Sequence, residues 1–177
     1  DALAAVELSG IVRHGKVVVS LHRYENIFDA PRLSSIVAGL MDIARTRSIL
    51  FVLHPPTEAQ LKKHGLLDAL ASSPGIELHQ RMPYTAFIAQ LAASSLVITD
   101  GGSNQEELAL LGVPTLILRR ETERRDGLGR NAVLESDVSD WVDFVASGSY
   151  EQLRTSGARE YGGVSDRIVD ALVSDRA

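Results

Sequence analysis

The residue types of an anion-binding site gather between residues 96 and 124, LVITDGGSNQEELALLGVPTLILRRETER. The apolar run at 96–99 is typical of a buried strand in a parallel sheet. The Asp-Gly-Gly turn at 100–102 tolerates a sharp bend and lets a ligand approach the backbone closely. Ser103 and Glu106 have the spacing of a capping box, so we expect a helix to begin there. Such a helix end presents unpaired N–H groups and partial positive charge, which favours a phosphate.

Side chains beyond this turn add groups that recognise nucleotides. Glu107 lies in the first two turns of the expected helix, where a carboxylate can accept hydrogen bonds from ribose hydroxyls. Five arginines also fall within residues 119–130, and guanidinium groups suit bidentate contact with phosphate. These are Arg119, Arg120, Arg124, Arg125 and Arg130. Together the groups point to a nucleotide or a nucleotide sugar. The alternative is an ordinary capped helix followed by a solvated basic loop, and the residue types leave both open.

The elements that position these residues alternate between strand and helix patterns. This alternation predicts an α/β fold, a parallel sheet with helices on both faces. We expect strands at 16–21, 49–53, 76–78, 96–99 and 115–118, a further short apolar run at 132–134, and helices at 31–47, 58–63, 66–71, 84–93, 103–111, 140–145, 150–154 and 166–173, with a helix or linker at 1–10.

His22 directly follows the first expected strand and opens a polar segment, residues 22–26, that we expect to be a loop. In an open α/β sheet the ligand crevice lies beyond the carboxyl ends of the strands, so His22 is placed where a ligand is met. A histidine packed in the loop is the alternative. After the second strand, Pro55 and Pro56 predict an extended exit, with Thr57 capping the helix that follows.

Composition narrows the classes of function. A chain of 177 residues is long enough for one well-buried domain and too short for two ordinary ones. The absence of cysteine excludes disulfides and thiolate metal sites. A net charge of -5 argues against nonspecific binding of nucleic acid. Apolar runs are too short to span a membrane, no G-x-G-x-x-G fingerprint is present, and no metal-ligand spacing occurs. We therefore expect a cytoplasmic protein without membrane partner, metal or cofactor.

Three motifs resemble those of the UDP-N-acetylglucosamine 2-epimerase family. TDGGSNQEELALLGVPTLILRRETERR is similar to the family's D-S-G-G-x-Q-E-E … G-x-P … T-E-R-P-E signature, SLHRYEN resembles its H-R-x-E-N segment, and His54-Pro55 resembles its later H-P. The motifs occur in the family's order. The resemblance implies the two-domain fold of GT-B glycosyltransferases. Residues 1–177 would form its Rossmann-like, nucleotide-sugar-binding C-terminal domain, and the N-terminal half would lie outside this sequence.

The resemblance also implies a role for each matching residue. His22 would lie beside the diphosphate and act in catalysis, while Phe87 would contact the uracil ring and Glu107 the ribose hydroxyls. Core packing is the alternative for Phe87, and a structural turn for His54. The other residues that would bind UDP are Arg23, His54, Gly101, Gly102, Ser103 and Arg124.

Enzymes of this family invert C2 of UDP-N-acetylglucosamine by eliminating UDP and adding it back from the other face. That chemistry needs a base for the C2 proton and positive charge near the departing pyrophosphate. The proton-transferring carboxylates belong to the N-terminal domain. The resemblance thus implies that this chain binds a UDP-N-acetylhexosamine, works with its own N-terminal domain in a homodimeric parent enzyme, and is inactive alone.

The chain departs from the family pattern at Gly101, where serine is usual, and at Arg125-Asp126, where Pro-Glu is usual. These departures suggest a divergent branch, such as one acting on another UDP-N-acetylhexosamine in polysaccharide biosynthesis. Two other functions stay open at this point. One is the donor-binding C-terminal domain of a GT-B glycosyltransferase, and the other is a stand-alone module that binds a nucleotide sugar without chemistry.

Overall fold

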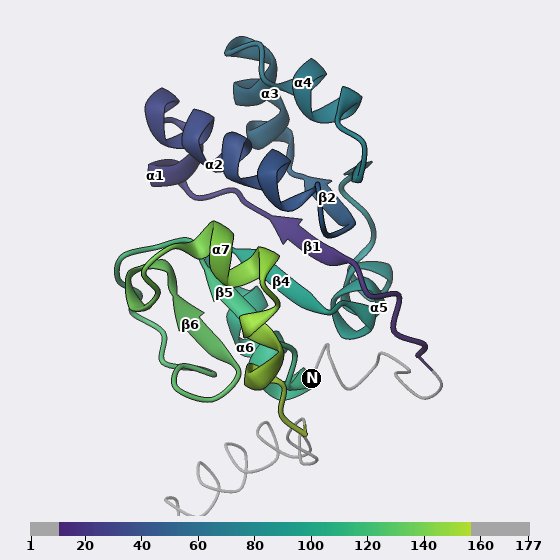
Figure 1. Cartoon of the computed structure of the whole chain (residues 1–177), viewed down its shortest axis with the longest axis vertical. Helices are drawn as coiled ribbons and strands as arrows, with labels where there is room; N and C mark the ends of the chain where they lie inside the picture. The colour runs from purple at the N-terminus through teal and green to yellow at the C-terminus, as the bar shows by residue number, and fades with distance from the viewer. Residues whose placement is uncertain (1–10, 157–177) are drawn as a thin grey trace, which may run out of the picture.

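Six parallel strands form one sheet in the order β3-β2-β1-β4-β5-β6 (Figure 1). The structure is a computed structural model and describes residues 11–156. The strands are β1 (Val17–Ser20), β2 (Ile49–Leu53), β3 (Ile76–Gln80), β4 (Leu96–Thr99), β5 (Thr115–Ile117) and β6 (Ala132–Leu134). β1 and β4 are neighbours although β2 and β3 separate them in sequence. The strand order therefore reverses between β1 and β4, which is the switch point where open α/β sheets bind ligands.

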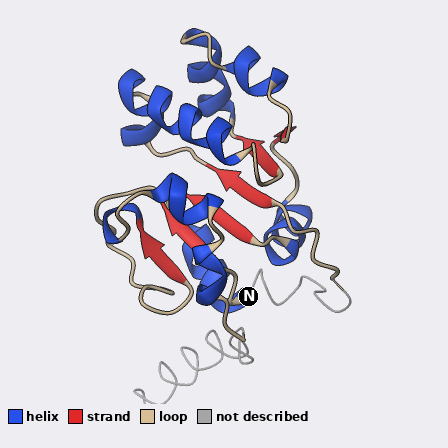
Figure 2. Ribbon diagram, in the orientation of Figure 1, coloured by secondary structure: helices blue, strands red, loops and turns tan. Residues whose placement is uncertain are grey.

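Helices cover both faces of this sheet (Figure 2). Val17 and Val19 of β1 face one apolar layer and Val18 faces the other, because successive side chains of a strand point to opposite sides. The first layer includes residues of α2, α3, α4 and α7, and the second includes residues of α5 and α6. The helices are α1 (Tyr24–Ile27), α2 (Ala30–Ile43), α3 (Pro55–Lys63), α4 (Leu67–Ser72), α5 (Tyr84–Ala93), α6 (Ser103–Leu111) and α7 (Trp141–Ala146), with 3-10 helices η2 (Glu135–Asp137) and η3 (Ser149–Leu153).

The predicted α/β class and the order of its elements are confirmed. β1, β2, β4 and β5 are buried on both faces, which is why they read as apolar runs in the sequence. Each fully buried Val, Leu or Ile stabilises the fold by roughly 1.5–3 kcal/mol through removal of apolar surface from water. No helix in the described part of the chain has the length and apolar character needed to cross a membrane.

Several local expectations are wrong. Residues 24–27 form helix α1 instead of a loop, and the amide of Asn26 is buried there, donating to the carbonyl of Leu118 over 2.9 Å. Pro55 and Pro56 begin helix α3, since proline suits the first helical positions, and Thr57 donates to the carbonyl of Leu21 instead of capping. η3 is a 3-10 helix. The helices expected at 1–10 and 166–173 lie outside the described residues.

Candidate functional site

Four loops meet at the carboxyl edge of the sheet. Each follows one of the neighbouring strands β1 to β4. His54, Arg81 and Asp100 come directly after their strands, and His22 is the second residue after β1. Because parallel strands end at the same edge, these residues come from distant parts of the sequence to one place. The edge includes the switch point between β1 and β4.

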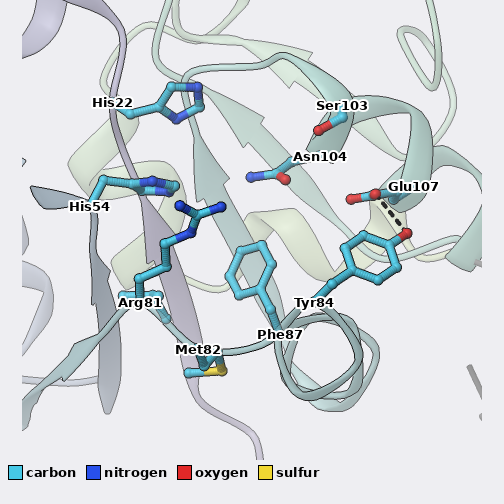
Figure 3. Close-up of a pocket in the computed structure, with 10 residues that line it drawn as sticks. His22, His54, Arg81, Met82, Tyr84, Phe87, Ser103, Asn104 and Glu107 are labelled. Carbon is cyan, nitrogen blue, oxygen red and sulfur yellow. Dashed lines mark hydrogen bonds between the residues drawn. The ribbon is translucent and has the colours of Figure 1, made fainter. Parts of the chain in front are cut away.

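A cavity of about 240 Å³ opens beside these loops (Figure 3). It contains five of the nine residues that the sequence predicted for the site, together with five that it did not. The view shows His22, His54 and Arg81 opposite Ser103 and Glu107 of α6, with Tyr84 and Phe87 of α5 below them. The lining residues are His22, Val52, His54, Arg81, Met82, Tyr84, Phe87, Ser103, Asn104 and Glu107.

The turn between β4 and α6 depends on two glycines. Gly101 and Gly102 have φ angles of 92° and 84°, which side-chain-bearing residues rarely adopt. Gly102 is the N-cap of α6, so the predicted capping box is wrong: Ser103 is already the first helical residue, and no side chain caps the helix. The first N–H groups of α6 therefore lack a side-chain acceptor. This leaves a helix end suited to an anion, with the hydroxyl of Ser103 beside it in the cavity.

His22 lies between a buried carboxylate and this turn. Its Nδ1 is 3.4 Å from Oδ1 of Asp100, and its Nε2 faces Gly102, 4.0 Å from the point that a β-carbon on that glycine would occupy. Asp100 is fully buried, and its Oδ2 accepts the backbone N–H groups of His22 (2.8 Å) and Arg23 (2.7 Å). The carboxylate thus fixes the backbone that carries His22. The imidazole is left with one nitrogen toward Asp100 and the other toward the glycine turn.

The ring of His54 lies beside that of His22, with centroids 4.8 Å apart and the two planes tilted by 40°. Its Nε2 lies 3.2 Å from the hydroxyl oxygen of Ser20 at the end of β1. Burial lowers the pKa of His54 below its ordinary value of 6.5, and the nearby His22 and Arg81 lower it further, while Asp100 opposes them. His54 is therefore neutral at neutral pH. A bound anion would offset the neighbouring positive charge and favour its protonation.

Glu107 occupies the opposite side of the cavity and already has a hydroxyl partner. The hydroxyl of Tyr84 donates to Oε1 of Glu107 over 2.8 Å. Desolvation by burial raises the pKa of the Glu107 carboxyl, while the Tyr84 bond lowers it. Burial and the carboxylate together raise the pKa of Tyr84 to about 12, so its hydroxyl stays a donor at physiological pH. The carboxylate of Glu107 thus accepts a hydrogen bond from a hydroxyl group at this position. Binding of ribose hydroxyls needs the same kind of acceptor.

The predicted arginine cluster does not line the cavity. Arg124 forms an ion pair with Glu106, and Gln105 donates to the carbonyls of Arg124 (3.1 Å) and Asp126 (2.9 Å), which fixes their loop to α6. Arg23 also lies outside the lining. The predicted roles of Arg23 and Arg124 in binding UDP stay predictions. The further ion pairs join Arg23 to Glu123 (3.3 Å) and Arg119 to Glu25 and Glu123 (both 2.9 Å).

Sequence reasoning missed five lining residues and the buried Asp100. Arg81 follows strand β3 directly, so the rule that ligands meet the carboxyl ends of strands would have found it. Tyr84 and Asn104 lie in the first turns of α5 and α6, and the residues they face across the cavity are known only from the three-dimensional structure. In the sequence, Asp100 looks like a turn residue. Its hydrogen bonds to His22 and Arg23, 78 and 77 positions earlier, leave no local signal. Among residues 11–156, no cluster of three or more metal-ligating side chains occurs.

Comparison with known proteins agrees with the fold and the motifs. Residues 3–170 match the UDP-N-acetylglucosamine 2-epimerase family. A UDP-N-acetylglucosamine 2-epimerase of Methanocaldococcus jannaschii is 37% identical over 109 residues, which cover 60% of this chain and 30% of that protein. A UDP-2,3-diacetamido-2,3-dideoxy-D-glucuronate 2-epimerase of Pseudomonas aeruginosa is 30% identical over 162 residues, covering 89% of this chain and 44% of that protein.

Among solved structures, the Methanocaldococcus jannaschii UDP-GlcNAc 2-epimerase in complex with UDP-GlcNAc and UDP superposes with a TM-score of 0.78. The two are 28% identical, and the match covers 98% of this chain and 50% of the other. The chain thus spans half or less of the length of these relatives. Because the family match extends over nearly the whole sequence and the fold agrees with it, the chain belongs to the UDP-N-acetylglucosamine 2-epimerase family.

Proposed function

We propose that the cavity binds the UDP part of a UDP-N-acetylhexosamine, and that the chain is the C-terminal nucleotide-binding domain of a 2-epimerase. The observation that carries the proposal is the arrangement of the cavity. A hydroxyl-accepting carboxylate, Glu107, lies on one side, and two histidines and the uncapped end of α6 lie toward the switch point. A nucleoside diphosphate has the matching order of groups, with ribose hydroxyls next to a charged diphosphate.

The role of each residue follows from its place in the cavity. Phe87 on α5 offers an aromatic side chain for the uracil ring, and Glu107 offers its free carboxylate oxygen to the ribose. Ser103 and the N–H groups at the start of α6 would hold a phosphate. His22 would bind the diphosphate through Nε2, the nitrogen that faces Gly102, while Nδ1 faces Asp100.

Positive charge at His22 matters most when the bond between sugar and diphosphate breaks. Negative charge then builds on the departing oxygen, and a group placed there stabilises the transition state more than the bound substrate. Elimination and re-addition of UDP is the reaction that we propose for the parent enzyme. The relative solved with UDP-GlcNAc and UDP supports this choice of ligand.

The cavity is smaller than a typical ligand pocket. Its volume of about 240 Å³ falls below the roughly 300–1,000 Å³ of typical ligand pockets. Its lining also includes one carboxylate, Glu107, which cannot both accept ribose hydroxyls and transfer a proton at C2 of the sugar. We therefore propose that the sugar and the proton-transferring acids meet in a cleft completed by an N-terminal domain, and that residues 1–177 bind the nucleotide without converting it.

Isothermal titration of the chain with UDP and UMP tests the binding proposal. We expect UDP to bind, and UMP to bind more weakly because it lacks the second phosphate. No UDP binding at millimolar protein concentration would contradict the function. Equal affinities for UDP and UMP would remove the diphosphate from the site.

A coupled activity assay tests the catalytic part. The chain alone should not interconvert UDP-N-acetylglucosamine and its manno epimer, whereas the chain joined to its native N-terminal half should interconvert this pair or a closely related one. Activity of the chain alone would show that its own residues include the proton-transferring groups.

A further inference from the structure

The cavity includes one guanidinium, that of Arg81, which the resemblance to the family does not assign. Arg81 directly follows β3 and lines the cavity. In Figure 3 its side chain extends into the cavity, and the guanidinium ends between the rings of His54 and Phe87. Its place in the cavity is therefore between the histidines at the switch point and the aromatic side chain of α5.

Arg81 differs from the neighbouring arginines in its partners. Arg23, Arg119 and Arg124 each lie within ion-pair distance of a glutamate. Within residues 11–156, Arg81 has no carboxylate within the 4.0 Å that defines such a pair. Its charge is thus available to a ligand, whereas the charge of Arg124 is partly offset by Glu106.

The carboxylates near the cavity do not neutralise this charge. Oδ2 of Asp100 is occupied by two backbone N–H groups and Oδ1 faces His22. Glu107 is held by Tyr84 on the opposite side. The positive charge of Arg81 is felt at His54, whose pKa it lowers together with burial and His22. The guanidinium of Arg81 therefore places positive charge on the side of the cavity that also holds His22 and His54, opposite Glu107.

We propose that Arg81 is the arginine that contacts the ligand's phosphate groups, in the role that the sequence motif gave to Arg124. The inference rests on the proposed nucleotide site and names the residue that supplies its fixed charge. A guanidinium stays ionised at every physiological pH and can contact two phosphate oxygens at once. Arg81 therefore supplies a positive charge to the cavity that does not change with pH in this range.

Titration of an Arg81→Gln variant with uridine, UMP and UDP tests the assignment. UDP binding should weaken about tenfold. This is the lower end of the effect expected for losing a hydrogen bond to a charged group, because Arg81 is solvent-exposed. Uridine binding should stay the same, and Arg81→Lys should retain most of the UDP affinity. Arg125→Gln is the matched control, since it removes an exposed guanidinium outside the cavity lining. It should leave UDP affinity unchanged.

Two results would overturn the inference. Unchanged UDP affinity in Arg81→Gln would show that the side chain does not contact the ligand. Equal weakening of uridine and UDP binding would show that the Arg81 side chain stacks on the base.

Pyrophosphate provides a probe without a nucleoside: its binding should also require Arg81. If the wild type binds pyrophosphate through Arg81 but does not bind UDP, the proposed function fails while the assignment of Arg81 to phosphate stands.

NMR of the imidazole of His54 provides a readout independent of affinity. The charged groups that affect His54 are His22, Arg81 and Asp100. Loss of the Arg81 charge should raise the pKa of His54 in the free protein, and saturating pyrophosphate should raise it in the wild type. A folded Arg81→Gln variant with an unchanged His54 pKa would contradict the position of the guanidinium on which the inference depends.

Discussion

Nδ1 of His22 lies 3.4 Å from Oδ1 of Asp100, a carboxylate that is completely buried below the glycine turn. The other oxygen of Asp100 accepts two backbone N–H groups, so this side chain both anchors the loop after β1 and faces the imidazole. Oδ1 has no hydrogen-bond partner among the described residues. The imidazole of His22 is therefore in a position to satisfy this oxygen by donating from Nδ1, which would direct Nε2 toward the ligand.

Asp100→Asn separates the two roles of this carboxylate. The amide oxygen can still accept both backbone N–H groups, but its NH₂ group replaces the acceptor that faces His22. We expect unfolding free energy to fall by less than about 1 kcal/mol and UDP affinity to fall roughly tenfold. Asp100→Ala should destabilise by about 1–3 kcal/mol for each N–H left unpaired. Thermal melts, UDP titration and ¹⁵N NMR of the His22 tautomer check this, and an unchanged tautomer in Asp100→Asn would refute the orienting role.

When the chain is joined to its native N-terminal half, His22→Ala should lower turnover by about 10²–10³-fold. This is the usual effect of removing a group that stabilises charge in the transition state. UDP affinity should fall much less, because full negative charge develops only as the bond breaks. Turnover, UDP affinity and melting temperature of this variant are the measurements. A folded variant with full turnover would show that His22 only packs in its loop.

Glu107→Gln should weaken UDP binding by about 1–3 kcal/mol, since it replaces a charged hydrogen-bond acceptor in a half-buried position. The loss should disappear with 2′,3′-dideoxy-UDP, which has no ribose hydroxyls to donate. Titration of both proteins with both nucleotides forms a complete cycle. If the variant loses the same free energy with the dideoxy nucleotide, Glu107 does not contact the ribose.

Tyr84→Phe should raise the pKa of Glu107 above its value in the wild type. The Tyr84 hydroxyl donates to the carboxylate and so favours the charged form, against the effect of burial. ¹³C NMR of the Glu107 carboxyl across pH measures the change directly. Because phenylalanine keeps the ring, Tm should change little, and a pKa that stays constant would mean that the bond does not form in solution.

His54 should make stability depend on pH below 6.5. Its folded-state pKa lies below 6.5, so the unfolded chain takes up the proton first as the pH falls. The free energy of unfolding should therefore decrease as pH falls from about 6.5 through the folded pKa of His54. His54→Gln removes this contribution, so the stability of the wild type relative to the variant should be greater at pH 7.5 than at pH 5. Urea denaturation at both pH values measures it, and a constant difference would contradict the depressed pKa.

Local sequence signals determined the regular elements. β4 and α5 have the predicted bounds, because an apolar run between turn residues and an apolar stripe with helical spacing depend on neighbouring residues alone. α6 ends at residue 111 as predicted, where Gly112 follows with a φ of 64° that glycine adopts readily. Short-range reasoning was wrong where a contact from elsewhere decided the outcome. Asn26 is buried against Leu118, which places residues 24–27 in a helix although their polar sequence indicates a loop.

The residue types also predicted five of the residues that line the cavity, but not Arg81. A run of arginines next to a phosphate motif suggests phosphate binding, yet whether each guanidinium is free depends on which acids fold beside it. Glu25 lies far from Arg119 in sequence and 2.9 Å from it in space. Arg81 has no motif around it, and only its place at the end of β3 brings it to the cavity.

The sequence by itself determined that this is a parallel α/β domain of the 2-epimerase family, with a glycine turn and a helix that begins beside it. The tertiary structure decided which loops share one edge. The order of the strands brings these loops together. That order results from burial summed over the whole sheet, and no local sequence pattern records it. Placing β1 beside β4 brings His22 to Asp100 and the glycine turn, while β2 and β3 bring His54 and Arg81 to the same cavity.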